Sequence, residues 1–169
     1  MPDLAARLLA DPDVAPIGLG ARDSLRLEAG LCLYGQDVDR ATTPVEATLE
    51  WSIQPARRRG GARPGGFPGA EAILGQIETG PARRRVMLLP DGRAPMRADV
   101  ELFDAGDGRA VGRVTSGGFG PSLGAPVAMG YVPAALATPG TALLGRLRGN
   151  MQPVKVAATP LIKPGYKRA

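Results

Sequence analysis

Residues 83–90 read RRRVMLLP, and they are the first of six short apolar stretches that continue to residue 159 of this 169-residue chain. Each stretch is rich in Val, Leu, Met or Thr, and a Gly, Pro or Asp turn signal separates it from the next. The other five are ADVELFD (98–104), RAVGRVTSG (109–117), VAMGYV (127–132), TALLGRLRG (141–149) and MQPVKVAAT (151–159). With Asp91-Gly92 and Asp107-Gly108 as hairpin turns, this spacing predicts a small six-stranded antiparallel barrel or sandwich. We place its boundary with the preceding part of the chain near residue 82.

The preceding part of the chain has helical periodicity instead. Small or apolar residues recur at helical spacing from Ala21 onward, and Gly30 and Gly35 are expected to mark the end of this helix and the following turn. Residues 69–79, GAEAILGQIET, predict a short amphipathic helix, whereas the Gly- and Pro-rich residues 55–66 predict a loop. The fold class predicted for the whole chain is therefore α+β.

A capping-box pattern lies between these two helices. Thr43-Pro44-Val45-Glu46 places a hydroxyl and a carboxylate where each can bond the other residue's backbone N–H. We therefore expect a short helix from Pro44 to about Glu50, followed by a strand at residues 51–53. The glycine-rich residues 114–122 lack the lysine and following helix of a phosphate loop, so we interpret them as a wide turn between strands.

The composition excludes several classes of chemistry. The chain has no histidine, which argues against most zinc, Ser-His-Asp and Cys-His sites, so we predict no metal site. Its one cysteine excludes an internal disulfide. No apolar run approaches the roughly 20 residues that span a bilayer. Residues 1–14, MPDLAARLLADPDV, carry acids and no cleavable signal pattern, so the predicted location is the cytoplasm.

Two arginines on the first long helix are candidates for anion binding. Arg22 and Arg26 are four residues apart, so helical spacing places them on one face, where they could jointly meet a carboxylate. Asp23 and Glu28 lie beside them. The alternative is a partly solvated helix whose arginines pair with its own acids.

Basic residues gather at three places, which raises the possibility of nucleic-acid binding. Arg57 to Gly66 resembles a single-stranded-RNA-binding tract, but it is one short copy with only Phe67 as an aromatic nearby. We therefore interpret the clusters, which also include 83–85 and the lysines of the C-terminal tail, mainly as solvated surface.

Residues 18–35, GLGARDSLRLEAGLCLYG, followed by TTPVEATLEWSI (42–53), resemble the T protein of the glycine cleavage system, a family of tetrahydrofolate-dependent aminomethyltransferases. The resemblance continues in order through GGFPGAEAIL (65–74), GRVTSGGFGPSL (112–123) and PGTALLGRLRG (139–149) to the terminal GYK (165–167). It covers essentially the whole chain.

The resemblance implies a fold and a reaction. It implies that residues 1–82 are the C-terminal remnant of the folate-binding domain with a linker helix, and that residues 83–169 form a C-terminal β-barrel. In this family, tetrahydrofolate attacks the aminomethyl group on the lipoyl arm of H protein, releasing ammonia. The family's catalytic aspartate lies in an N-terminal half that this chain lacks, so we assign no catalytic residue and expect no activity from the chain alone. A separate chain supplying that half is an open possibility.

The resemblance also implies two folate-binding residues, Arg22 and Tyr166. Asp23 is a candidate for orienting Arg22, by adjacency alone, and Gln36 stands where the motif often has histidine. The expected partners are lipoylated H protein, the missing N-terminal half and tetrahydrofolate as co-substrate, in a bacterial cytoplasm, with no nucleic acid and no membrane. Two alternatives stay open: another folate-dependent one-carbon transferase or demethylase of the same fold, and a basic RNA-binding or interaction module.

Overall fold

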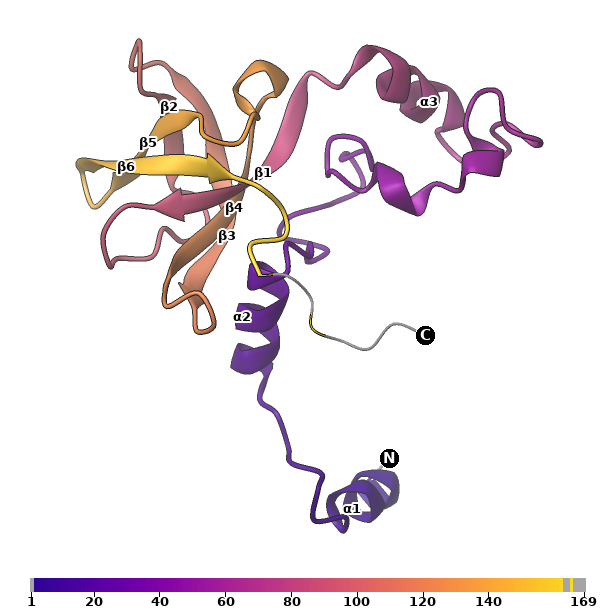
Figure 1. Cartoon of the computed structure of the whole chain (residues 1–169), viewed down its shortest axis with the longest axis vertical. Coiled ribbons are helices and arrows are strands. Elements are labelled where there is room, and N and C mark those ends of the chain that lie inside the picture. The colour runs from indigo at the N-terminus through magenta and orange to yellow at the C-terminus, as the bar shows by residue number, and fades with distance from the viewer. Residues whose placement is uncertain (1, 163–164, 166–169) are drawn as a thin grey trace.

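The computed structural model describes residues 2–162 and Gly165, and its elements follow the predicted order (Figure 1). The helices are α1 (Pro2–Leu9), α2 (Leu19–Glu28) and α3 (Ala70–Thr79), with 3-10 turns η1 (Glu50–Ser52), η2 (Pro55–Arg57) and η3 (Ala134–Leu136). The strands are β1 (Arg83–Pro90), β2 (Glu101–Asp104), β3 (Ala110–Gly120), β4 (Ala125–Pro133), β5 (Ala142–Leu147) and β6 (Asn150–Ala157).

The strands close into an antiparallel barrel in the order β1-β4-β3-β2-β5-β6, with β6 pairing back onto β1. The predicted α+β class with a six-stranded barrel is confirmed, and closure excludes a sandwich. Asp107-Gly108 does connect two paired strands, β2 and β3. The hairpin predicted at Asp91-Gly92 is wrong, because β1 pairs with β4 and β6 rather than with β2. Gly92 still makes a turn with φ of 88°, but a turn dipeptide does not specify which strand becomes the neighbour.

Two apolar clusters lie on opposite faces of the barrel wall, as the two-residue period of a strand requires. Val86 and Leu88 of β1 point into the barrel interior, where Met96 and Leu102 also lie. Met87, between them in sequence, points outward and packs with three other buried residues, which are Leu27, Val127 and Met129. Leu27 belongs to α2, and burying such a side chain stabilises the fold by about 1.5–3 kcal/mol. The outer cluster therefore fixes α2 on β1 and β4.

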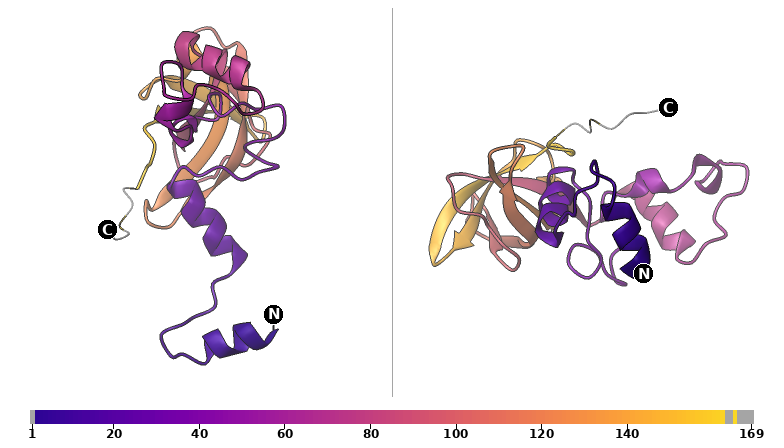
Figure 2. Two further views of the ribbon diagram at one scale, coloured as in Figure 1. Left: turned by 90° about the vertical axis from the view of Figure 1, so that its right-hand side faces the viewer. Right: turned by 90° about the horizontal axis from the view of Figure 1, so that it is seen from below.

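The remaining helices extend away from this body. Figures 1 and 2 show α1 standing apart from the barrel beyond α2, and α3 on an arm that leaves the barrel at the start of β1. The predicted helix at 69–79 is confirmed as α3, which follows Gly69. No helix within the described residues has the length and apolar character needed to cross a membrane.

The predicted helix from Pro44 to Glu50 is wrong, although its capping box forms. Thr43 N donates to Glu46 Oε2 at 2.9 Å, and Glu46 N donates to Thr43 Oγ1 at 3.1 Å. The chain then leaves the helical path at Thr48, which has φ of 58°. Strand β1 explains the departure, because Arg85 N donates to Glu46 O at 2.7 Å and Thr48 Oγ1 donates to Arg85 O at 2.9 Å.

Two further expectations are corrected. The strand expected at residues 51–53 is absent, because residues 50–52 form the 3-10 turn η1 and leave Trp51 exposed. The glycine-rich segment is mostly strand, because β3 runs to Gly120 and only residues 121–124 turn. Glycine suits position 117 of this strand because the backbone at Met96 passes close to it. A Cβ at position 117 would lie 1.7 Å from the carbonyl oxygen of Met96.

Candidate functional site

A hollow of about 330 Å³ opens beside the first turns of α2. The residues that line it are Leu19, Gly20, Arg22, Asp23, Leu33 and Gln36. Arg22 is exposed there, and within residues 2–162 no hydrogen bond or ion pair engages its guanidinium. Its planar set of N–H donors is therefore available to a bound group with acceptor oxygens.

Arg26, one turn further along α2, is fully engaged inside the protein. Its side chain is 9% exposed and donates to Asp37 Oδ2 at 2.5 Å and to Ser116 Oγ at 2.9 Å. Its Nε also donates to Asp23 Oδ1 at 2.8 Å. The structure therefore brings Arg22 alone, and not the Arg22–Arg26 pair, to the hollow. Asp23 contacts Arg26, and its suggested role in orienting Arg22 stays a prediction.

Asp37 is the centre of the network that holds this region on the barrel. Its carboxylate is fully buried, and besides Arg26 it accepts from Leu33 N at 2.9 Å and from Thr115 Oγ1 at 2.5 Å. Its backbone carbonyl accepts from the hydroxyl of Tyr131 at 2.7 Å. A buried carboxylate persists only when its oxygens are partnered in this way. The network thus joins α2 and the following loop to β3 and β4.

Burial changes the acidity of Tyr131. Removal of its phenol from water, reinforced by the nearby Cys32, raises the pKa of Tyr131 to about 12, against the opposing effect of Arg85 and Arg83. Arg83 lies over the Tyr131 ring, 4.9 Å from its centroid. The phenol is therefore held as a neutral hydrogen-bond donor.

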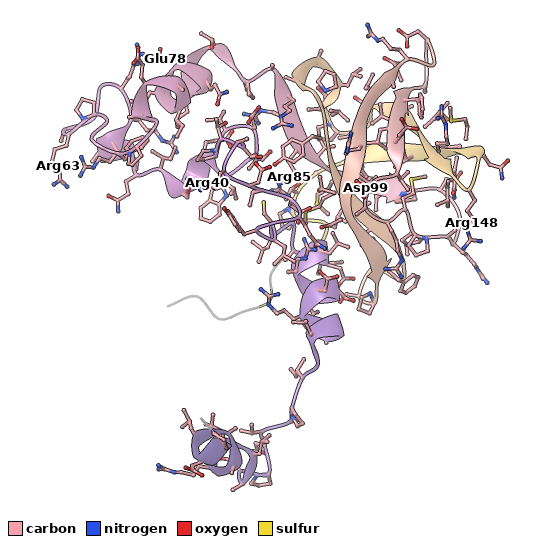
Figure 3. All side chains as sticks on the ribbon, turned by 180° about the vertical axis from the view of Figure 1, so that it is seen from behind. Arg40, Arg63, Glu78, Arg85, Asp99 and Arg148 are labelled. Carbon is pink, nitrogen blue, oxygen red and sulfur yellow. The ribbon has the colours of Figure 1, made fainter. Side chains whose placement is uncertain are left out.

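Two more buried charges fasten the same region. Glu28 Oε1 accepts from Ser122 N at 2.8 Å and Leu123 N at 2.9 Å, which attaches the β3–β4 turn to the end of α2. Arg85 donates to Ala47 O at 2.8 Å and Gly30 O at 3.1 Å. Figure 3 shows Arg85 where the chain that precedes β1 meets the barrel.

A second, larger cleft of about 520 Å³ lies between residues 36–42 and the barrel. Residues of β1, β3 and β4 line its barrel side, among them Arg83, Arg113 and Tyr131. Asp39 lies on its other side, where a hydrogen bond from the Thr42 hydroxyl lowers the pKa of the Asp39 carboxyl. Gln36 lines both this cleft and the hollow at Arg22.

Comparison with known proteins matches both parts of the chain to one family. Residues 83–163 match the family described as "Glycine cleavage T-protein C-terminal barrel domain", and residues 4–57 match the "GCVT N-terminal domain". The chain belongs to the glycine cleavage T-protein family.

Individual aminomethyltransferases are similar over almost the whole chain. It is 47% identical over 167 residues to the mitochondrial aminomethyltransferase of Gallus gallus, a match that covers 99% of this chain and 41% of that protein. The mitochondrial aminomethyltransferase of Homo sapiens is 47% identical over 163 residues, covering 96% of this chain and 39% of that protein. The crystal structure of glycine cleavage system aminomethyltransferase T from Bartonella henselae superposes with a TM-score of 0.85 and 48% identity, over 95% of this chain and 43% of that one. The chain thus spans about two fifths of the length of these T proteins.

The region around the hollow contains buried structural residues that sequence reasoning did not single out as such. Asp37, Glu28 and Arg85 are buried charges, and the only local sign was an ionisable residue within an apolar run, such as Glu28 in LRLEAGL. Most of their partners are backbone groups, and apart from those of Leu33 and Arg26 they lie far away in sequence, so no spacing pattern reveals them. The predicted folate-binding residue Tyr166 lies outside the described residues, so its role stays a prediction.

Proposed function

We propose that this chain is part of an aminomethyltransferase that transfers the one-carbon unit from aminomethyl-lipoyl H protein to tetrahydrofolate, with release of ammonia. Its relatives of 47–48% identity bear the name aminomethyltransferase. The observation that best supports a folate site here is the exposed, unengaged guanidinium of Arg22 beside a rigidly anchored stretch of chain. H protein and tetrahydrofolate are the partners that this proposal requires.

The hollow at Arg22 fits part of a folate. Arg22 supplies donors for a carboxylate or ring carbonyl, and Leu19 and Leu33 supply apolar surface for a flat ring. Its volume of about 330 Å³ is at the lower end of the roughly 300–1,000 Å³ typical of ligand sites. We therefore propose that this chain forms one wall of the site and that residues of the parent T protein beyond this chain form the rest.

The role proposed for this chain is binding and orientation. Arg22 holds the co-substrate, while Asp37 and Glu28 keep α2 and the turn at residues 121–124 fixed on the barrel. We assign no proton-transfer step to these residues, and the predicted catalytic aspartate belongs to the part of the T protein that this chain does not span. The 169-residue chain alone is accordingly proposed to be inactive.

The test compares the chain alone with a fusion to the part of the Bartonella henselae T protein that this chain does not match. Formation of methylenetetrahydrofolate from lipoylated H protein is the readout, and only the fusion is expected to turn over. In the fusion, Arg22→Ala should raise KM for tetrahydrofolate about tenfold or more, because a hydrogen bond to a charged group contributes about 1.5–3 kcal/mol. Arg63→Ala, at an exposed arginine in the loop before α3, is the matched control.

Each outcome separates one part of the proposal from the others. Turnover by the chain alone would refute its inactivity. A folded fusion with no turnover would refute the assigned reaction and favour another one-carbon transferase of the same fold. An unchanged KM in Arg22→Ala would remove Arg22 from the folate site.

The RNA-binding alternative loses support from the contacts of the arginine tract. Arg57 donates to Gly65 O at 3.2 Å, and Arg58 donates to the carbonyl oxygens of Ile53 and Glu50. These side chains shape their own loop, which leaves fewer charges for phosphates. The cytoplasmic location and the lack of a metal stay predictions, and the two relatives named above are described as mitochondrial.

A further inference from the structure

Gln36 is the one side chain that lines both the hollow at Arg22 and the cleft against the barrel, among the residues that the structure describes. It is exposed, and it directly precedes the buried Asp37. Its place between the two depressions makes its hydrogen-bonding direction important for any ligand that enters either one.

The neighbours of Gln36 determine which way its amide faces. Arg26 Nη2 donates to Gln36 Oε1 at 3.3 Å, and Ser116 Oγ donates to the same oxygen at 3.4 Å. Arginine has donors and no acceptor, so the atom that faces Arg26 must be the amide oxygen. The Nε2 group therefore faces away from Arg26, and no acceptor within residues 2–162 and Gly165 engages it.

The orientation of the amide is set before any ligand binds. Arg26 is itself fixed by Asp37 and by Ser116, both of which are buried. A side chain whose partner is locked loses less conformational freedom on binding, so its hydrogen bond to a ligand contributes more affinity.

The hollow consequently offers N–H donors from two residues. Arg22 and Gln36 Nε2 both present N–H groups, and Oδ1 of Asp23, the acidic residue in the lining, is bound to Arg26. A ligand group with two acceptor atoms, such as a carboxylate or a ring carbonyl with an adjacent ring nitrogen, matches this set.

We propose that Gln36 is a second ligand-binding residue that donates through Nε2, beside Arg22, to an acceptor group of tetrahydrofolate. This inference rests on the proposed folate site and adds to it a residue and a chemical requirement. The side chain at position 36 must donate a hydrogen bond to the ligand while its acceptor atom faces Arg26, and glutamine meets both conditions.

The test is anaerobic titration of the fusion protein introduced above with tetrahydrofolate, measured by isothermal titration calorimetry, because the fusion contains the complete proposed site. Gln36→Leu removes the donor and should weaken binding about tenfold, as expected for a hydrogen bond to a charged acceptor. Gln36→Glu keeps an acceptor for Arg26, which protects the fold, but turns the second atom into an acceptor, so it should weaken binding at least as much. Gln54→Leu, at another exposed glutamine outside both depressions, is the matched control and should leave affinity unchanged.

The outcomes distinguish this inference from the proposed function. If Arg22→Ala weakens binding and both Gln36 variants bind like the unaltered fusion, the Gln36 proposal is overturned and the folate site stands. If the unaltered fusion shows no binding, or if no variant changes its affinity, the folate site proposed at Arg22 falls together with the Gln36 proposal. A parallel titration with p-aminobenzoylglutamate, which has the carboxylates and no pterin, identifies the acceptor. If the Gln36 variants weaken binding of p-aminobenzoylglutamate, the acceptor is a carboxylate. If they weaken binding of tetrahydrofolate but not of p-aminobenzoylglutamate, the acceptor belongs to the pterin.

Discussion

Arg26 and Asp37 form an ion pair that helps to fix α2 and the following loop to the barrel, with Arg26 Nη1 lying 2.5 Å from Asp37 Oδ2. The exposed fractions of the two side chains are 9% and 0%. Hydrogen bonds from Leu33 N and Thr115 Oγ1 complete the partners of the carboxylate, so the pair links α2, the following loop and β3. Together with the Leu27 cluster and Glu28, this link positions α2 and the following loop, which line the hollow at Arg22.

Asp37→Asn should therefore destabilise the protein strongly. The asparagine amide would present N–H groups to at least one existing donor and would leave the mostly buried Arg26 with the half-exposed Asp23 as its remaining acidic partner. Breaking a buried pair by removing one partner costs about 3–5 kcal/mol. Urea unfolding followed by circular dichroism measures the loss.

Glu101→Gln is the control for this substitution. Glu101 pairs with Arg146 at 2.8 Å on the barrel surface, where both side chains are about half exposed. Such surface pairs contribute about 0–1 kcal/mol, so Glu101→Gln should change stability little. Equal losses in the two variants would contradict the structural importance assigned to burial of Asp37.

Gly117→Ala should also destabilise the barrel, for a steric reason. Its new Cβ would lie 1.7 Å from Met96 O, a backbone atom that cannot move without shifting the chain between β1 and β2. The cost of such overpacking is expected to be about 3 kcal/mol.

Gly75→Ala is the contrasting control for this substitution. A Cβ at Gly75 of α3 meets nothing within 4 Å, and Gly75→Ala should stabilise the helix by about 0.5–1 kcal/mol. Thermal unfolding of the two variants tests the prediction, and a harmless Gly117→Ala would contradict the close crossing.

Glu28→Ala should release the β3–β4 turn from α2. Two backbone N–H groups, of Ser122 and Leu123, would lose their acceptor, and a hydrogen bond to a charged group contributes about 1.5–3 kcal/mol. Amide hydrogen exchange at these two residues should become faster than in the unaltered protein. Glu71→Ala, at an exposed position in α3, should leave their exchange rates unchanged.

Because of the buried phenol of Tyr131, we expect the protein to lose stability at high pH. Burial raises the pKa of Tyr131 to about 12 in the folded protein from its ordinary value of 10.0, so folding favours the protonated phenol. The stabilisation is complete below pH 10 and is lost as the pH rises from there through about 12. Tyrosinate absorbance during a pH titration should show this late component, and Tyr131→Phe should remove it. Persistence of the component in Tyr131→Phe would assign it to another tyrosine.

Local rules predicted the elements that depend on local geometry. The capping box at Thr43 and Glu46 forms, α2 ends just before Gly30, and all six strands lie within or beside the predicted apolar stretches. These features depend on residues within a few positions of each other, which a sequence displays directly. The helix expected after Pro44 failed for the opposite reason, because strand β1 binds the Glu46 carbonyl and the Thr48 hydroxyl.

The sequence by itself determined the order of the six strands, the helices α2 and α3, the turns at Asp91-Gly92 and Asp107-Gly108 and the resemblance to the T-protein family, because periodicity, capping residues and motifs are local. Only the tertiary structure decided which strands are neighbours and which charges are buried. Arg22 and Arg26 are equivalent by helical spacing, yet Arg26 meets Asp37 and Ser116 while Arg22 stays exposed in the hollow. The reason is physical: the free energy of a charged side chain depends on whether partners from distant segments replace its water, and folding alone brings those segments together.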